Sequence, residues 1–228
     1  MKEQLVTKKI LNWYDFNKRQ LPWRKNVSSQ KKQYYTLVSE FMLQQTQVVT
    51  VIPYFNKFIK EIPNLKALSK INNRKLIKLW EGLGYYSRAR NLKKTAQNIN
   101  KNFNGKLPDN FDDLISLPGI GVYTASAILS IAFNKPYIPL DGNIERVLKR
   151  YLYLKKKKEI QKENLIKKKS LFGMSLRSSD YAQALMELGA LICKPKNPAC
   201  NKCPISNNCK SLKKGDFNLT KDVKKNKN

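Results

Sequence analysis

The chain of 228 residues contains no histidine. This absence excludes zinc fingers with mixed cysteine and histidine ligands, Ser-His-Asp hydrolases and Cys-His proteases, because each of them needs an imidazole. No stretch approaches the ~20 apolar residues that a helix needs to span a bilayer, so we expect no membrane association. Acidic residues are also few: 16 Asp and Glu stand against 45 Lys and Arg, and the formal net charge is +29. This excess favours a polyanionic partner, with nucleic acid first, although a genomic bias towards Lys and Asn would produce the same composition.

The sequence also lacks the alternation of apolar and polar residues that predicts a β-strand. Most segments instead carry apolar residues at helical spacing, and prolines and glycines separate these segments. We therefore predict an all-α fold. The expected helices are 5–17, 34–51, 54–59, 65–68, 75–81, 86–103, 111–116, 122–133, 143–153, 159–170 and 180–191.

Cysteine is scarce, and all four cysteines lie in one run, Cys193-x6-Cys200-x2-Cys203-x5-Cys209. Four thiolates are the ligand set of a [4Fe–4S] cluster, and the short spacing lets one local segment surround it. A zinc ribbon usually has two C-x2-C knuckles, whereas this run has one. Two disulfides are a further alternative. No signal peptide is recognisable, so we expect a reducing cytoplasm, which disfavours disulfides and favours the iron–sulfur cluster.

A glycine-containing segment, Leu117-Pro118-Gly119-Ile120-Gly121, lies between two expected helices. Its glycines permit a tight turn directly before a helix N-terminus, where backbone N–H groups can contact a phosphate. This pattern is typical of a helix-hairpin-helix, and we assign DNA-phosphate contacts to Gly119 and Gly121. A Gly-x-Gly turn alone is weak evidence, because any connection between helices can contain one.

Two acidic residues, Glu40 and Asp141, lie in positions that suit chemistry. Glu40 lies in an apolar helical segment, where desolvation raises the pKa of a carboxyl group and lets it hold a proton near neutral pH. Such a group can act as a general acid, but a buried glutamate capped by a neighbouring Ser or Gln is the structural alternative. Asp141 precedes an expected helix. It can cap that helix or face a cleft, and the sequence leaves both interpretations open.

The hairpin, an aspartate about twenty residues later and the terminal cysteine run together resemble the endonuclease III superfamily of base-excision DNA glycosylases. Three further segments resemble the MutY-type adenine glycosylases within that superfamily: Leu21–Arg24, Ser39–Gln47 and Trp80–Leu92. The resemblance covers nearly the whole chain. It implies a helix-hairpin-helix glycosylase fold with a six-helix barrel and a second helical domain that carries the [4Fe–4S] cluster.

The resemblance also implies where these domains begin and end. The six-helix barrel is expected over 26–134, with the hairpin at about 112–131. A discontinuous helical domain is expected over 1–25 and 135–215, with the cluster loop at 193–209, and residues 216–228 are expected to form a basic, disordered tail.

By the same resemblance, the chain is a monofunctional glycosylase that hydrolyses the N-glycosidic bond of adenine opposite 8-oxoguanine or guanine in double-stranded DNA. Glu40 matches the acid that protonates adenine, and Asp141 matches the carboxylate that stabilises or traps the oxocarbenium-like sugar. Bifunctional relatives carry a lysine four residues after the first hairpin glycine, and its amine forms a Schiff base. Tyr123 occupies that position here, and a phenol cannot form one. Asn143 completes the implied catalytic set.

An enzyme that acts on a base of a duplex must flip that base out, so other residues must fill the gap and hold the base. Leu83 and Tyr85 also fit core positions, but the neighbouring Gly82 and Gly84 favour an exposed turn, and Trp23 fits the core equally well. The implied readers of the gap and the opposite strand are Gln45, Thr46, Leu83 and Tyr85. The implied adenine pocket contains Arg19, Leu21, Trp23, Arg24, Leu43 and Gln183.

Most MutY-type enzymes continue into a C-terminal domain that helps to recognise 8-oxoguanine. This chain ends soon after Cys209, so we do not expect strict selectivity for 8-oxoguanine. Two alternatives stay open. An endonuclease III-like glycosylase for oxidised pyrimidines is disfavoured by Tyr123 and Gln44–Gln47, and a non-catalytic iron–sulfur DNA-binding module is disfavoured by the presence of both Glu40 and Asp141. We expect a monomer.

Overall fold

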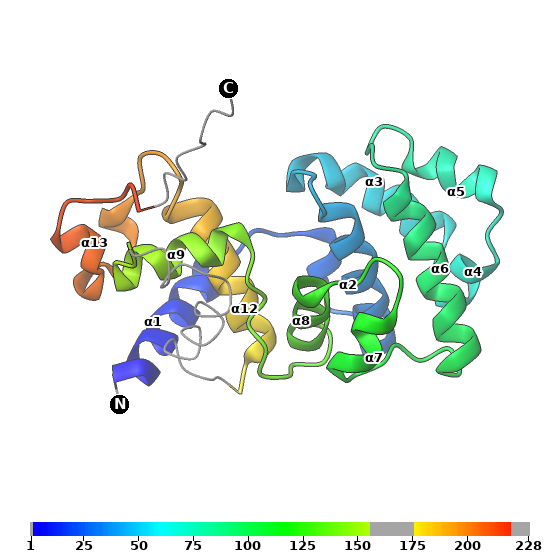
Figure 1. Cartoon of the computed structure of the whole chain (residues 1–228), viewed down its shortest axis with the longest axis horizontal. Helices are drawn as coiled ribbons and strands as arrows, with labels where there is room; N and C mark the ends of the chain where they lie inside the picture. The colour runs from blue at the N-terminus through cyan, green and yellow to red at the C-terminus, as the bar shows by residue number, and fades with distance from the viewer. Residues whose placement is uncertain (1, 156–175, 220–228) are drawn as a thin grey trace, which may run out of the picture. The chain divides into compact units, whose positions relative to one another are not determined.

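A computed structural model describes residues 2–155 and 176–219, and the chain divides into two compact units. Unit 1 combines Met1–Lys18 with Leu140–Asn228, and unit 2 is the continuous segment Arg19–Pro139. The described part contains helices and turns but no strand, which confirms the all-α prediction (Figure 1). Unit 2 extends beyond the expected barrel of 26–134 at both ends. The expected helix 159–170 and most of the expected tail lie outside the described residues.

Unit 2 is centred on helix α2 (Ser29–Leu43), which packs against four other described helices of the unit. Leu37, Val38 and Phe41 of α2 are fully buried. Burying one such side chain contributes about 1.5–3 kcal/mol relative to leaving it exposed, so this face of α2 is a main source of stability. The other helices of the unit are η1 (Pro22–Arg24), α3 (Val48–Glu61), α4 (Leu65–Lys70), α5 (Asn73–Trp80), α6 (Ser87–Asn102), α7 (Phe111–Ser116) and α8 (Val122–Ile131).

The prediction of one helix over 34–51 is wrong, because the chain leaves the helix after Leu43 and begins α3 at Val48. At Gln45 the backbone adopts a φ of 58°, which no α-helix contains. The carbonyl oxygens at the end of α2 accept hydrogen bonds from the side chain of Arg88, far along the chain. A tertiary contact therefore ends this helix, and a local pattern cannot show it.

Pro53 lies inside α3, although the sequence suggested that it separates two helices. A proline inside a helix costs about 3 kcal/mol, because it removes one hydrogen bond and crowds the preceding turn. The apolar face of α3 offsets this cost, since Val51, Phe55 and Phe58 are fully buried. Tertiary packing thus overrides the local preference of proline.

Unit 1 places α12 (Ser178–Glu187) against α1 (Lys2–Asn17) and α9 (Gly142–Leu152), and these helices lie side by side in Figure 1. A π-helical turn, η3 (Leu188–Ile192), follows α12 and packs on α9. The remaining helices among the described residues of the unit are η4 (Cys200–Lys202), η5 (Ser206–Asn208) and α13 (Lys210–Lys213).

Gly189 of η3 makes a close approach to α9 possible. A Cβ atom at this position would lie 2.6 Å from Cβ of Asn143, which is closer than two carbon atoms can pack. Within the described ranges, no helix is both long enough and apolar enough to cross a membrane.

Candidate functional site

Glu40 lies on α2, in the core of unit 2, and only 5% of its surface is exposed. The neighbouring Ser39 donates its hydroxyl hydrogen to the carbonyl of Thr36 at 3.1 Å. Helix α8 packs against α2 and carries the half-buried Tyr123 in its first turn. The structure therefore places the expected acid in a buried position, while its proton affinity stays a prediction.

The hairpin turn between α7 and α8 is held by α2 and α6. Gly119 has a φ of 80°, and a Cβ atom there would lie 2.9 Å from both Cβ of Asn91 and the ring of Phe41. Thr95 donates to the carbonyl of Pro118 at 2.7 Å. Both the backbone conformation and the packing therefore require glycine at this turn.

The N-terminus of α8 is exposed, since Val122, its first residue, is 48% exposed. Gly121, the residue that precedes α8, is exposed and has no side chain with which to cap the first turn. Gln44 donates its amide to the carbonyl of Gly119 at 3.3 Å and so links the hairpin to the end of α2. Uncapped N–H groups at a helix N-terminus suit an anionic ligand such as a phosphate.

The segment of the expected adenine pocket around η1 packs on α2 and α3. Leu21 is buried, and the ring of Trp23 meets the ring of Phe55 edge-on at 5.2 Å between centroids. Arg24 donates to the carbonyl of Arg19 at 3.3 Å. These contacts fix the segment to the core. Leu43, also of the expected pocket, is half-buried at the end of α2.

The four residues that are expected to read DNA differ in exposure. Gln45 is exposed, and Tyr85 is 64% exposed, and both have a left-handed backbone. Thr46 is half-buried and donates its hydroxyl hydrogen to the carbonyl of Gln44 at 3.4 Å. Leu83 is buried in the core with 5% of its surface exposed, so the exposed turn inferred from the neighbouring glycines does not include it. A wedge role for Leu83 requires it to leave the core.

In unit 1, Asp141 caps α9. Its Oδ1 accepts the backbone N–H of Ile144 at 2.7 Å, and its Oδ2 accepts from the amide of Asn143 at 2.9 Å. The capping interpretation is therefore confirmed, and both oxygens are held in fixed positions. Desolvation raises the pKa of Asp141, while the bonds from Ile144 and Asn143 and the charge of Arg146 oppose this rise.

Arg146 links Asn143 to the cysteine segment, a connection that the sequence did not reveal. Its Nη2 donates to Oδ1 of Asn143 at 2.8 Å and to the carbonyl of Gly189 at 2.8 Å. Its Nε donates to the carbonyl of Cys193 at 2.7 Å. A continuous set of hydrogen bonds therefore runs from Asp141 to the first cysteine.

Gln183, assigned to the adenine pocket, lies on α12 with 7% of its surface exposed. Its amide donates to the carbonyl of Ser179, one helical turn earlier, at 3.1 Å. The carbonyl oxygen of its side chain remains available to accept a hydrogen bond.

The four cysteines are free thiols, and each is half-buried. Burial, together with the charges of the other three cysteines, raises the pKa of Cys203 to about 11. Burial and the neighbouring cysteines also raise the pKa values of Cys200 and Cys209. The thiols thus lie within electrostatic reach of one another. Among the described residues, however, no three Cys, Asp or Glu side chains form a group that could hold a metal ion, so a closed ligand set is not present.

The chemistry of this donor set nevertheless suits an iron–sulfur cluster. Arg150 donates to Sγ of Cys193 at 3.5 Å and to the carbonyls of Lys194 and Pro195 at 2.6 and 2.8 Å. Its Nε donates to the carbonyl of Phe217 at 3.2 Å. Cysteine side chains are the ligands that hold such clusters, so these four residues are the donor type that a [4Fe–4S] cluster requires.

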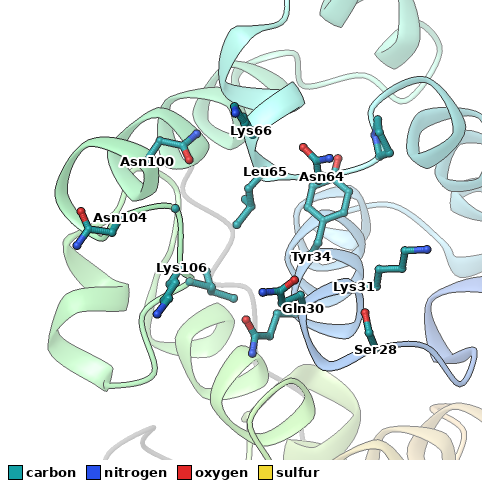
Figure 2. A pocket seen from close by; sticks show the side chains of 14 residues that line it. Ser28, Gln30, Lys31, Tyr34, Asn64, Leu65, Lys66, Asn100, Asn104 and Lys106 are labelled. Carbon is teal, nitrogen blue, oxygen red and sulfur yellow. The ribbon is translucent and has the colours of Figure 1, made fainter.

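A cavity of about 730 Å³ lies in unit 2, among the starts of α2 and α4 and the end of α6. Figure 2 shows Leu65 between amide side chains that include Asn100 and Gln30. Of the described residues that line it, none belongs to the expected catalytic, adenine-binding or DNA-reading sets. Its lysines, Lys31, Lys66 and Lys106, occur at about the same frequency as lysine and arginine along the whole chain.

A family model described as "HhH-GPD superfamily base excision DNA repair protein" matches residues 38–170, more than half of the chain. The chain belongs to this superfamily. The match begins in α2 just before Glu40 and includes the hairpin, Asp141 and Asn143, so HhH-GPD membership covers both acidic residues of the candidate site.

Curated relatives of this HhH-GPD chain include two adenine DNA glycosylases. The protein from Buchnera aphidicola subsp. Baizongia pistaciae is 47% identical over 203 residues, which are 89% of this chain and 57% of that protein. The protein from Rattus norvegicus is 40% identical over 89% of this chain and 40% of its own length. The chain therefore spans about three fifths or less of the curated relatives that it matches.

Two solved structures share the fold. A thermostable thymine-DNA glycosylase superposes with a TM-score of 0.81 and 26% identity over 93% of this chain and 97% of its own chain. A non-covalent endonuclease III–DNA complex gives a TM-score of 0.74 and 21% identity over 94% of this chain and 98% of that chain. These likenesses confirm the helix-hairpin-helix glycosylase fold.

Proposed function

We propose that this HhH-GPD protein is a monofunctional, MutY-type adenine DNA glycosylase that removes adenine opposite 8-oxoguanine or guanine in double-stranded DNA. The observation that carries this proposal is the presence of Glu40, buried in α2, and Asp141, held at the N-terminus of α9, in a chain 47% identical to an adenine DNA glycosylase. Two carboxyl groups in different environments are what cleavage of a glycosidic bond requires.

Glu40 acts in this proposal as the general acid. Its burial favours the neutral, protonated carboxyl group, because a carboxylate loses hydration there. The proton passes to a ring nitrogen of adenine, and adenine then leaves as a neutral base. General acid catalysis of this kind contributes roughly 10²–10⁴-fold to the rate.

Asp141 acts as the carboxylate that stabilises the positive charge on the sugar. The bonds from Ile144 and Asn143 fix both of its oxygens, so little reorganisation is needed when the charge develops. These bonds and the nearby charge of Arg146 partly oppose the desolvation that raises its pKa. Water then adds to the sugar and leaves an abasic site.

The proposed reaction stops at the abasic site because Tyr123 stands where bifunctional relatives carry a lysine. A phenol cannot form a Schiff base with the sugar, so no strand cleavage follows from this position. Tyr123 lies in the first turn of α8, directly after the hairpin, and we assign it a place beside the reacting groups.

We further propose that Cys193, Cys200, Cys203 and Cys209 hold a [4Fe–4S] cluster. When bound, the cluster would cross-link the loops between these cysteines and thereby stabilise the end of unit 1. The residues of the chain perform the steps at the base and the sugar.

The substrate is tested with three duplexes, which carry adenine opposite 8-oxoguanine, adenine opposite guanine, or thymine glycol. We expect alkali-dependent strand breaks at adenine in the first two duplexes and no reaction with the third. Cleavage at thymine glycol would instead indicate an enzyme for oxidised pyrimidines. Binding without any cleavage would indicate a non-catalytic DNA-binding module.

A further inference from the structure

Arg88 is a buried cation in the first turn of α6, with 6% of its surface exposed. Arg90 of the same helix is exposed, whereas Arg88 points into the core. Its guanidinium group instead donates hydrogen bonds to backbone carbonyl oxygens in two separate turns of unit 2.

The first of these turns follows the end of α2. Nη1 of Arg88 donates to the carbonyls of Met42 at 2.8 Å, Phe41 at 3.3 Å and Gln44. Carbonyl groups at a helix C-terminus have no partner within the helix and carry the negative end of its dipole. The guanidinium group of Arg88 therefore supplies the hydrogen-bond donors that these carbonyls lack within the helix, and it stabilises the C-terminal end of α2.

The second turn joins α5 to α6. Nη2 of Arg88 donates to the carbonyls of Leu83 at 2.9 Å and Gly84 at 3.1 Å. The guanidinium carbon also lies 5.5 Å from the ring centre of Trp80 and 5.6 Å from that of Tyr85. A cation at these distances from aromatic rings is attracted to them.

Two of the carbonyls that bond Arg88 lie directly before residues with a positive φ. The carbonyls of Gln44 and Gly84 belong to the peptide groups that directly precede Gln45 and Tyr85. Gln45 has a φ of 58° and Tyr85 a φ of 47°, a region that residues other than glycine rarely adopt. The angle φ describes rotation about the N–Cα bond, and the nitrogen of that bond belongs to the preceding peptide group. A hydrogen bond that fixes this peptide group therefore restricts φ of the next residue. Such conformations persist only where surrounding contacts impose them.

We propose that Arg88 is a positioning residue that holds Gln45 and Tyr85 in their left-handed conformations and so presents both side chains together. The use of these two side chains to read the strand opposite the excised adenine rests on the proposed function. The role of Arg88 in holding the two backbone conformations does not depend on the proposed function. A lysine is not an equivalent replacement for Arg88, because its ammonium group lacks the planar fork whose two nitrogens each bond one of the turns.

Hydrogen exchange of the free, full-length protein tests this role without any DNA. Arg88→Lys keeps the charge but loses the planar fork, and Arg90→Lys, at an exposed position of the same helix, is the matched control. Hydrogen bonds to charged groups contribute enough that their loss changes an opening equilibrium by about tenfold or more. We therefore expect amides of residues 43–47 and 82–86 to exchange about tenfold faster in Arg88→Lys, with the rest of unit 2 and all of Arg90→Lys unchanged.

Three results would overturn the proposal: unchanged exchange, faster exchange in one turn alone, and a uniform increase throughout unit 2. An Arg88→Lys chain that fails to fold would assign Arg88 to the stability of the core and would equally count against it.

A second measurement probes the backbone strain itself. Glycine adopts a positive φ without strain, so Gln45→Gly should raise the midpoint of thermal unfolding relative to Gln45→Ala. This difference should vanish in an Arg88→Lys background, because the turn is then released. An equal difference in both backgrounds would show that Arg88 does not impose the conformation.

The same preparations separate this proposal from the proposed function. If the native chain excises no adenine while exchange behaves as expected, the positioning role stands and the function is wrong. If the native chain excises adenine while exchange in the two turns is unaffected, the function stands and the positioning role is wrong.

Discussion

At the scale of single residues, Asp141 has one role as the cap of α9 and a second, proposed role as the charged carboxylate that stabilises the sugar. The two roles make conflicting demands on its charge. It caps α9, which stabilises the fold, but its desolvated charge is costly, as its raised pKa indicates. Because the folded state binds the proton of Asp141 more tightly than the unfolded state does, this group makes folding less favourable as pH rises through its raised pKa.

The substitution Asp141→Asn separates these roles. Asparagine caps a helix about as well as aspartate and carries no charge, so the midpoint of thermal unfolding at neutral pH should stay equal or rise. Single-turnover excision of adenine should fall by at least about 10²-fold, because the charge on the sugar loses its carboxylate. A variant that is less stable than the native chain by several degrees would show that the carboxylate serves the fold.

The raised pKa of Asp141 also predicts the acidic side of the pH profile. In the proposed mechanism Asp141 must be ionised to stabilise the sugar cation, and its pKa lies above the ordinary aspartate value of 3.8. Excision should therefore begin to fail at a higher pH on acidification than for an unperturbed aspartate. A plot of the logarithm of the single-turnover rate against pH, with the enzyme saturated with DNA, shows the pH at which excision begins to fail. A flat profile down to pH 4 would contradict it.

At the scale of helices and turns, the approach of η3 to α9 depends on Gly189. Gly189→Ala places a Cβ atom 2.6 Å from Cβ of Asn143, so the two elements must move apart. Overpacking of this kind costs about 1–3 kcal/mol, and the midpoint of unfolding should fall by several degrees. Gly142→Ala is the matched control, because nothing lies within 4 Å of its added Cβ. Equal midpoints for the two variants would show that η3 adapts without cost.

Local patterns predicted most of these elements, but they did not predict the helix ends that distant contacts determine. The expected helix 111–116 agrees with α7 to the residue, because Asn110 caps it and no distant contact intervenes. The break after Leu43 was missed because Arg88 supplies the partners of the α2 carbonyls. Likewise, the sequence pointed to Asp141 as a candidate carboxylate of the site, but its link through Arg146 to Cys193 depends on folding and has no local signal.

At the scale of the whole molecule, the cysteine segment is tied to α9 by arginine side chains. Arg146 and Arg150 both donate to carbonyls of this segment, and Arg150 also donates to Sγ of Cys193.

The net charge of +29 suits a protein that binds the phosphates of DNA. Binding of this kind weakens as the salt concentration rises.

The cofactor proposal predicts the appearance of the purified protein. It should be brown, absorb broadly near ~400 nm and contain about four irons per chain, as thiolate-bound iron–sulfur centres do. Cys193→Ser should lower the yield of folded protein more than the single-turnover rate of the fraction that folds. A colourless, fully active protein with one zinc per chain would assign the four thiols to zinc instead.

The central claim is that Glu40 and Asp141 together hydrolyse the bond between adenine and its sugar. Its most direct test is the single-turnover release of free adenine, quantified by mass spectrometry, from a duplex with adenine opposite 8-oxoguanine. The native chain should release one adenine per duplex and leave the strand intact until alkali is added. Glu40→Gln keeps the shape of the side chain but has no acidic proton to transfer. This variant should bind the duplex with the same affinity as the native chain and release adenine at least about 10²-fold more slowly. Release within about tenfold of the native rate would contradict the assignment of Glu40, and no release by the native chain would contradict the proposed function.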